Sequence, residues 1–337
     1  MKSKITSGIR IFIFLAIGLL LFWLVYRDQK VDEIVEALKS ANYFWIIVSL
    51  VLALFSHMSR ALRWNLLINP LGYKPRFLNT FFSVMVMYLS NTAIPRSGEI
   101  VRCSILKKYE KVPISQLLGT VVVERVFDFI MLFIFLFVVL ITQFGVVLEF
   151  VQNNPGIETK VNTLLQVKYL VILAAMFIAL VVFTYFFRKK FKESMVYKKL
   201  RELLASFIAG LDTVRKMDKK WQFIGHSVFI WTMYFLMIYV TFWSFEFTQH
   251  LTVMTGLTVF VMASFGMVAP SPGGIGTWHF MVIETLIIFG VEKTPDANAF
   301  AFAVHGAMTL LLVVVGVISL VMLPIINSKA NKDENIV

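Results

Sequence analysis

Charged residues are scarce in this chain. Asp, Glu, Lys and Arg together make up 15% of its 337 residues, whereas soluble domains carry about 25%. Hydrophobic residues make up 58% of the chain, and its mean hydropathy is +0.79. So little charge cannot cover the surface of a large water-facing domain. We therefore predict an all-α, polytopic membrane protein that forms one transmembrane domain over residues 1–337.

Cysteine is almost absent, and so are catalytic motifs. The single cysteine, Cys103, excludes an internal disulfide, a zinc finger and a CxxC redox pair. No HExxH, GxSxG or phosphate-loop motif occurs in the sequence. We therefore expect no enzymatic activity, no metal and no cofactor.

Positive charge is in excess, with a formal net charge of +12. In a membrane protein this excess usually marks cytoplasmic loops and contacts with anionic headgroups, so we do not expect nucleic acid as a partner. Residues 188–220 carry eleven Lys or Arg against four acidic residues, which places this segment in the cytoplasm. Its apolar residues recur at helical spacing, which predicts an amphipathic helix that lies on the membrane surface or packs on the bundle.

Six apolar runs are long enough to cross a membrane, because about 20 residues suffice. They cover residues 9–26, 43–60, 115–141, 167–187, 221–244 and 298–324. Alternation from the cytoplasmic segment 188–220 places both termini in the cytoplasm. It also assigns Arg60 and Arg63 to a cytoplasmic loop, 60–76.

Two further segments, 77–111 and 251–290, are apolar, then broken by proline and glycine, and then helical again. Each is predicted to form a broken or re-entrant hairpin, which brings the total to about eight membrane segments. Pro95 to Gly98 and Pro270 to Gly273 have the same spacing. Alternation places the two hairpins on opposite faces, which predicts inverted-topology repeats. Two ordinary kinked helices are the alternative.

Six charged residues lie in or near the first break and in the third span. They are Arg96, Glu99, Arg102, Glu124, Arg125 and Asp128. Each would cost about 2.5–3.5 kcal/mol near the bilayer centre, so partners are required. Helical spacing puts Glu124 and Asp128 on one face. We predict a compensating network that includes Arg96 and Arg102, and purely structural ion pairs are the alternative.

The first break also favours an anion. Arg96 and Arg102 lie beside the start of a helix near Ser97, where free amides and the helix dipole attract phosphate. Glu99 competes for the same field. The predicted headgroup-binding residues are Arg96, Ser97, Gly98, Glu99, Arg102, Arg125, Pro272, Gly273, Gly274 and Gly276. The predicted proton- or ion-coupling residues are Glu124, Asp128, His279, Glu284 and His305.

Three sequence blocks, NTAIPRSGEIVR, VVVERVFDFI and APSPGGIGTWH, resemble those of a known family. It is the flippase-like, lysylphosphatidylglycerol-synthase transmembrane family, and the similarity covers nearly the whole chain. Its GE and ER residues correspond to Gly98, Glu99, Glu124 and Arg125. Its PSPGG element corresponds to residues 270–274.

The resemblance implies a lipid substrate. The family's best-known members form the lipid-translocating part of the multiple peptide resistance factor, and other relatives are linked to polyprenyl-phosphate sugar metabolism. That factor also carries a soluble aminoacyl-transfer domain, which we do not expect here because a short polar tail follows residue 324. Lipid aminoacylation is therefore not expected.

These observations predict translocation of an anionic or phosphate-bearing lipid across a bacterial inner membrane. Membrane lipids are the expected partners, and a homo-oligomer or a lipid-modifying enzyme partner is left open. A secondary transporter of a small soluble anion is one alternative. An accessory subunit of a lipid-modifying or glycosyl-transfer enzyme is a second, and an intramembrane enzyme is a third.

Overall fold

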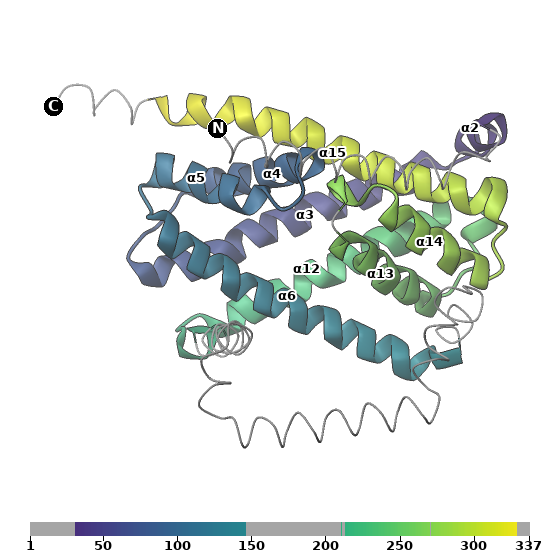
Figure 1. Ribbon diagram of the computed structural model, residues 1–337, viewed down its shortest axis with the longest axis horizontal. Helices are drawn as coiled ribbons and strands as arrows, with labels where there is room; N and C mark the ends of the chain where they lie inside the picture. The colour runs from purple at the N-terminus through teal and green to yellow at the C-terminus, as the bar shows by residue number, and fades with distance from the viewer. Residues whose placement is uncertain (1–30, 146–209, 211–212, 270, 329–337) are drawn as a thin grey trace, which may run out of the picture.

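The fold of residues 31–145, 210, 213–269 and 271–328 is seen in a computed structural model. All regular secondary structure in these residues is helical (Figure 1). The predicted spans 9–26 and 167–187 and most of the basic segment 188–220 lie outside the described residues. Both chain termini lie outside them as well.

Four long helices form the body of the protein. They are α3 (Tyr43–Ile68), α6 (Ile114–Thr142), α12 (Lys220–Thr241) and α15 (Asn298–Ile326). Together with their short helical extensions, all four are long and apolar enough to cross a membrane. At a rise of about 1.5 Å per residue, the 29 residues of α15 extend about 43 Å. The four predicted spans that fall on described residues are therefore confirmed as apolar helices of membrane-spanning length.

Short helices connect or extend these elements. They are α2 (Val31–Lys39), η1 (Asn69–Leu71), η2 (Phe242–Ser244), η3 (Glu246–Thr248), η4 (Pro272–Gly274) and the π-helical turn η5 (Lys293–Ala297). Local chemistry sets the helix ends. The Asn42 side chain accepts a hydrogen bond from the backbone N–H of Phe44 at 3.1 Å and so caps α3. Gly72, with a φ of 91°, ends η1.

The two segments predicted as broken hairpins both form a helix, a break and a second helix. In the first hairpin, α4 (Phe77–Ala93) is followed by α5 (Gly98–Glu110). In the second, α13 (Val253–Val268) is followed by α14 (Thr277–Ile288). The two arms of each hairpin pack on each other. The inverted-repeat relationship between the hairpins stays a prediction.

Helix α3 corrects the predicted boundary between the second span and its loop. The apolar run ends near residue 60, but the helix continues to Ile68. Arg60 and Arg63 are therefore buried helical residues, at 5% and 0% exposure, and not part of a loop. Hydropathy ends the span too early because it counts each arginine as exposed to its surroundings, whereas carboxylates of α6 meet both side chains.

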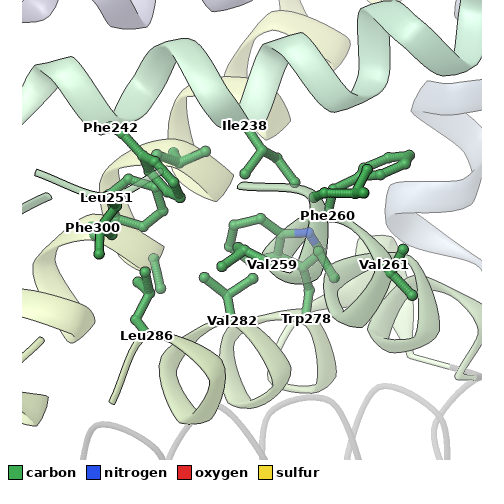
Figure 2. Packing of buried hydrophobic residues seen from close by; sticks show 14 of the residues in the cluster. Ile238, Phe242, Leu251, Val259, Phe260, Val261, Trp278, Val282, Leu286 and Phe300 are labelled. Atoms are coloured by element: carbon green, nitrogen blue, oxygen red, sulfur yellow. The ribbon is translucent and has the colours of Figure 1, made fainter. Parts of the chain in front are cut away.

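The largest apolar core joins the second hairpin to α12 and α15 (Figure 2). Phe260 of α13 packs edge-on against Trp231 of α12, with ring centroids 5.9 Å apart. Phe300 of α15 lies against Phe242, at 5.7 Å. Aromatic rings therefore contribute to the apolar packing that holds this hairpin against its neighbours.

Helix α15 runs past both hairpins (Figure 1) and is fixed to the first one at two points. A Cβ placed on Gly316 would lie 2.6 Å from Cβ of Leu89, so α15 and α4 approach closely there. Near the end of α15, Asn327 and Asn79 exchange side-chain amide hydrogen bonds of 2.8 and 3.1 Å. Both asparagines are buried, which makes this pairing necessary.

A glycine stands where the arms of each hairpin cross. A Cβ on Gly98 of α5 would overlap the carbonyl oxygen of Met87 in α4. A Cβ on Gly266 of α13 would lie 2.7 Å from Cα of Trp278 in α14. In both cases the obstacle is backbone, which cannot move aside easily.

We predict that Gly98→Ala and Gly266→Ala each destabilise the protein by about 1–3 kcal/mol, since overpacking forces backbone shifts. Thermal unfolding in detergent measures the effect. Gly119→Ala on α6 is the matched control, because a Cβ there meets nothing within 4 Å. Equal melting temperatures for Gly266→Ala and Gly119→Ala would contradict the close arm packing.

Candidate functional site

The first break, between α4 and α5, is held by its own polar side chains. The backbone N–H of Gly98 donates to Oδ1 of Asn91 at 2.8 Å. The hydroxyls of Ser90 and Ser97 lie 2.7 Å apart and bridge the two arms. Arg96 sits in the left-handed region, with a φ of 61°. Such a conformation is uncommon for a residue with a side chain and points to a fixed, tight turn.

The second break, between α13 and α14, depends on glycine. Gly273, Gly274 and Gly276 have φ values of 57°, 81° and 81°, which side chains disfavour. The Thr277 hydroxyl donates to the carbonyl of Gly266 at 2.8 Å and so closes the turn. His279 accepts a hydrogen bond from the N–H of Gly276 at 3.3 Å. This break is therefore also ordered by specific hydrogen bonds.

The two breaks meet in space, although about 170 residues separate them in sequence. The turn η4 packs on α4. A Cβ on Gly273 would lie 3.6 Å from Cα of Thr92. Nη2 of Arg96 reaches the carbonyl oxygen of Val268 at 3.4 Å. His305 of α15 lies behind the second break, with its Nε2 3.0 Å from the carbonyl oxygen of Gly273. We call this meeting point, formed by residues 90–98, 266–269 and 271–277, the break junction.

A buried ionic network lies beside the first hairpin and joins three helices. Arg63 of α3 contacts Asp128 at 2.8 Å and Glu124 at 3.4 Å. Arg102 of α5 contacts Glu124 at 2.5 Å. Arg60 contacts Asp128 at 3.3 Å. The prediction that Glu124 and Asp128 share one face of α6 is therefore confirmed, and both carboxylates form ion pairs with arginines.

This network is deeply buried. The side chains of Arg63, Arg102 and Glu124 have no solvent-exposed surface. The Arg102 guanidinium also stacks on Trp64, 4.2 Å from the ring centroid. Burial makes each charge depend on its partners, since an ion left unpaired in such surroundings is very costly.

Arg125 and Glu99 form an ion pair on the outer side of the network. They are bonded to each other and are 44% and 21% exposed. Nη1 of Arg125 also lies 3.7 Å from Asp128. Glu99 therefore faces Arg125 of α6. The Glu99 carboxylate therefore competes less than predicted with an anionic ligand for the positive field at the start of α5.

The predicted network is confirmed for Arg102 and wrong for Arg96. In the part of the chain that the structure describes, no carboxylate pairs with Arg96, whose side chain is exposed and bonded to a backbone carbonyl. The cations missed were Arg60 and Arg63. Their spacing of three residues matches one face of a helix, as does that of Glu124 and Asp128, and this match was the available signal.

The predicted coupling residues fall into three separate places. Glu124 and Asp128 belong to the ionic network. His279 and His305 lie together at the second break, with ring centroids 4.5 Å apart. Glu284 lies nearer the other end of α14, where Lys293 pairs with it at 3.3 Å.

The predicted headgroup residues divide between the junction and the network. Arg96, Ser97, Gly98, Pro272, Gly273, Gly274 and Gly276 belong to the break junction. Arg102 belongs to the ionic network, and Arg125 and Glu99 form the outer pair. Within residues 31–145, 210, 213–269 and 271–328, no group of three or more His, Cys, Asp or Glu lies close enough to hold a metal ion.

We predict that Glu124→Gln destabilises the protein by about 3–5 kcal/mol, because it leaves Arg63 and Arg102 short of a buried counter-charge. Thermal unfolding in detergent measures this loss. Glu284→Gln removes one partner of the more exposed ion pair with Lys293 and should lower the stability by less than about 1 kcal/mol.

A double variant provides the second test of the network. Arg102→Gln combined with Glu124→Gln removes one charge of each sign, and Arg63 keeps Asp128. We expect the double variant to be more stable than Glu124→Gln alone. Additive losses would show that the two side chains are not coupled.

Comparison with known proteins supports a membrane assignment. The family model described as "Lysylphosphatidylglycerol synthase TM region" matches residues 11–316. A UPF0104 membrane protein of Methanothermobacter thermautotrophicus is 24% identical over 292 residues, which cover 79% of this chain and 82% of that protein. One of Pyrococcus horikoshii is 23% identical over 300 residues, covering 84% and 88%.

A third relative matches over a shorter region. A UPF0104 membrane protein of Methanocaldococcus jannaschii is 34% identical over 143 residues, which cover 41% of this chain and 42% of that protein. The match thus spans less than half of that relative. No solved structure matches the chain. All three relatives are archaeal, so the bacterial inner membrane stays a prediction. With four apolar helices in the described residues and a family match over residues 11–316, the chain is a multi-pass membrane protein that belongs to the lysylphosphatidylglycerol synthase TM-region family.

Proposed function

We propose that the protein translocates an anionic or phosphate-bearing lipid across the membrane. The break junction is the observation that carries this proposal. Irregular backbone at membrane depth persists only where it is packed in protein or lines a path for polar groups. Transporters built from repeats place their substrate sites where broken helices from two halves meet. Two hairpins that touch at their breaks fit this arrangement.

The charge at the junction favours an anion. Arg96 is exposed there, and within the described residues its side chain reaches the Val268 carbonyl at a long 3.4 Å. Helices α5 and α14 both begin at the junction, at Gly98 and Thr277. The amino ends of helices carry partial positive charge and bind phosphate groups readily.

The surroundings of Arg96 favour a lipid over a soluble anion. Large apolar side chains are exposed on both breaks, with Ile94, Met267 and Val268 at 38%, 52% and 51%. In a membrane protein, such side chains face hydrocarbon. A lipid headgroup could therefore reach Arg96 from the side while its chains remain in the bilayer. The family match is consistent with a membrane role that involves lipids.

Movement of one hairpin against the other would then expose the junction to each side in turn. The energy source could be an ion gradient, with Glu124, Asp128 or the pair His279 and His305 as carriers. We place the protein in the cell membrane and assign it no catalytic step. Transport of a soluble anion and a role as an accessory subunit are the competing functions.

The decisive experiment is lipid transport in proteoliposomes. The intact protein should move headgroup-labelled anionic phospholipid or polyprenyl phosphate faster than empty vesicles do. Arg96→Ala should slow transport about tenfold or more, because a hydrogen bond to a charged group contributes about 1.5–3 kcal/mol. Arg215 is exposed, and its neighbours Val214 and Met217 pack near Phe223, away from the junction, so Arg215→Ala should transport at the normal rate.

Folding of each variant is checked by its melting temperature before transport is measured. Failure of the intact protein to move any anionic lipid, under both a proton gradient and a membrane potential, would reject lipid translocation. The soluble-anion and accessory-subunit functions would then lead.

A further inference from the structure

A second group of polar side chains lies on the other side of Arg60 from the ionic network. It comprises His57 and Arg60 of α3, Tyr88 of α4 and Tyr234 of α12, and we call it the tyrosine–histidine cluster. Nη2 of Arg60 donates to the Tyr234 hydroxyl at 3.3 Å. The hydroxyls of Tyr234 and Tyr88 lie 3.1 Å apart. The ring of His57 lies against that of Tyr88, with centroids 4.5 Å apart.

Several polar atoms of this cluster are buried without a partner. Neither ring nitrogen of His57 has a hydrogen-bond partner among the residues that the structure describes, and Nε of Arg60 has none there either. His57 is 3% exposed and Arg60 is 5% exposed. Buried polar groups are almost always hydrogen-bonded, and an exception calls for a specific explanation. Tyr88 and Tyr234 are only partly buried, so the cluster is not closed on every side.

The charges around the cluster do not balance. The ionic network and its outer pair contain four arginines and three carboxylates in the described chain, which leaves one positive charge in excess. The four cations are Arg60, Arg63, Arg102 and Arg125, and the three anions are Glu99, Glu124 and Asp128. Asp128 is the acid bonded to Arg60, at 3.3 Å. The positive excess therefore borders the unpaired donors of the cluster.

These observations specify the ligand's chemistry. A guanidinium, two phenolic hydroxyls and an imidazole can all donate hydrogen bonds to one acceptor group. A cation would be repelled by Arg60. An oxyanion supplies several acceptor oxygens and also the missing negative charge, and Arg binds phosphate oxygens especially well.

We propose that His57, Arg60, Tyr88 and Tyr234 form a binding site for the phosphate group of the transported lipid. This inference rests on the proposed function and deepens it by naming a second binding site for the headgroup. Tyr88 lies five residues before the end of α4 at Ala93, about 8 Å along the helix axis. The phosphate would pass from Arg96 at the break junction to this site within the bundle.

Binding to the full-length protein in detergent tests the site. The probes are radiolabelled dioleoyl phosphatidic acid, inorganic phosphate and dioleoylglycerol, which lacks a phosphate. We expect phosphatidic acid to bind and dioleoylglycerol not to compete. Tyr234→Phe, which removes only a hydroxyl, should weaken phosphatidic acid binding about tenfold. Tyr239→Phe, also on α12 but packed against the rings of Phe235, Phe242 and Trp243, should leave binding unchanged.

His57→Leu gives a second readout that a merely structural role would not produce. Because the ring nitrogens of His57 are unpaired without ligand, the variant should melt at the same or a higher temperature than the intact protein. It should also bind phosphatidic acid about tenfold more weakly. A variant that loses stability but keeps full affinity would overturn the assignment of His57.

The probes distinguish the source of the phosphate. Competition by inorganic phosphate would show that the oxyanion alone is recognised, and a lack of competition would show that the lipid chains are also required. Binding by Tyr234→Phe and His57→Leu at intact-protein affinity would reject the site, as would failure to bind any phosphate-bearing probe. Transport with unchanged binding in these variants would reject this site and leave the proposed function standing. If binding depends on the cluster but the intact protein transports no lipid, the phosphate site would stand and the proposed transport function would be rejected.

Discussion

The ionic contacts around Glu124 determine how the first hairpin is held. Glu124 forms ion pairs with Arg102 of α5 and Arg63 of α3. Arg63 also contacts Asp128, one turn further along α6. Charged side chains thus join three helices, although each of these charges alone would be costly to place in hydrocarbon. Hydrophobic contacts have little orientational preference, whereas these pairs fix the depth and rotation of each helix. The position of the first break relative to α3 and α6 follows from them.

The second hairpin is held differently, and the contrast matters for movement. Its contacts to α12 and α15 are mainly apolar and include aromatic rings such as Phe260 and Phe300 (Figure 2). Its break is linked to its neighbours by hydrogen bonds, between Arg96 and the Val268 carbonyl and between His305 and the Gly273 carbonyl, whereas a buried ion pair holds the first hairpin. Breaking such hydrogen bonds costs less than breaking a buried ion pair. If one hairpin moves during transport, the second is therefore the better candidate, and the first serves as the fixed reference.

Much of this architecture follows from the sequence, because apolar run length and the Pro-Gly breaks are local signals. The four described spans and both hairpins are examples. The partners of the charges are different, since α3 and α6 are brought together only by folding. Arg60 and Arg63 looked like loop residues for that reason. His57 gave no signal at all, because nothing in its local sequence shows that its ring nitrogens end up buried without partners. The meeting of Arg96 with Val268 is likewise a property of the folded chain.

Helix α15 carries a further consequence. It touches the first hairpin at Gly316 and through Asn327, the residue just after its end, and it touches the second break through His305. A helix that contacts both hairpins couples them mechanically, because a tilt of α15 would alter both contacts. Movement of one hairpin against the other therefore requires α15 to shift relative to at least one of them. Natural variation at α15 positions should accordingly be matched by compensating changes in both hairpins rather than in one.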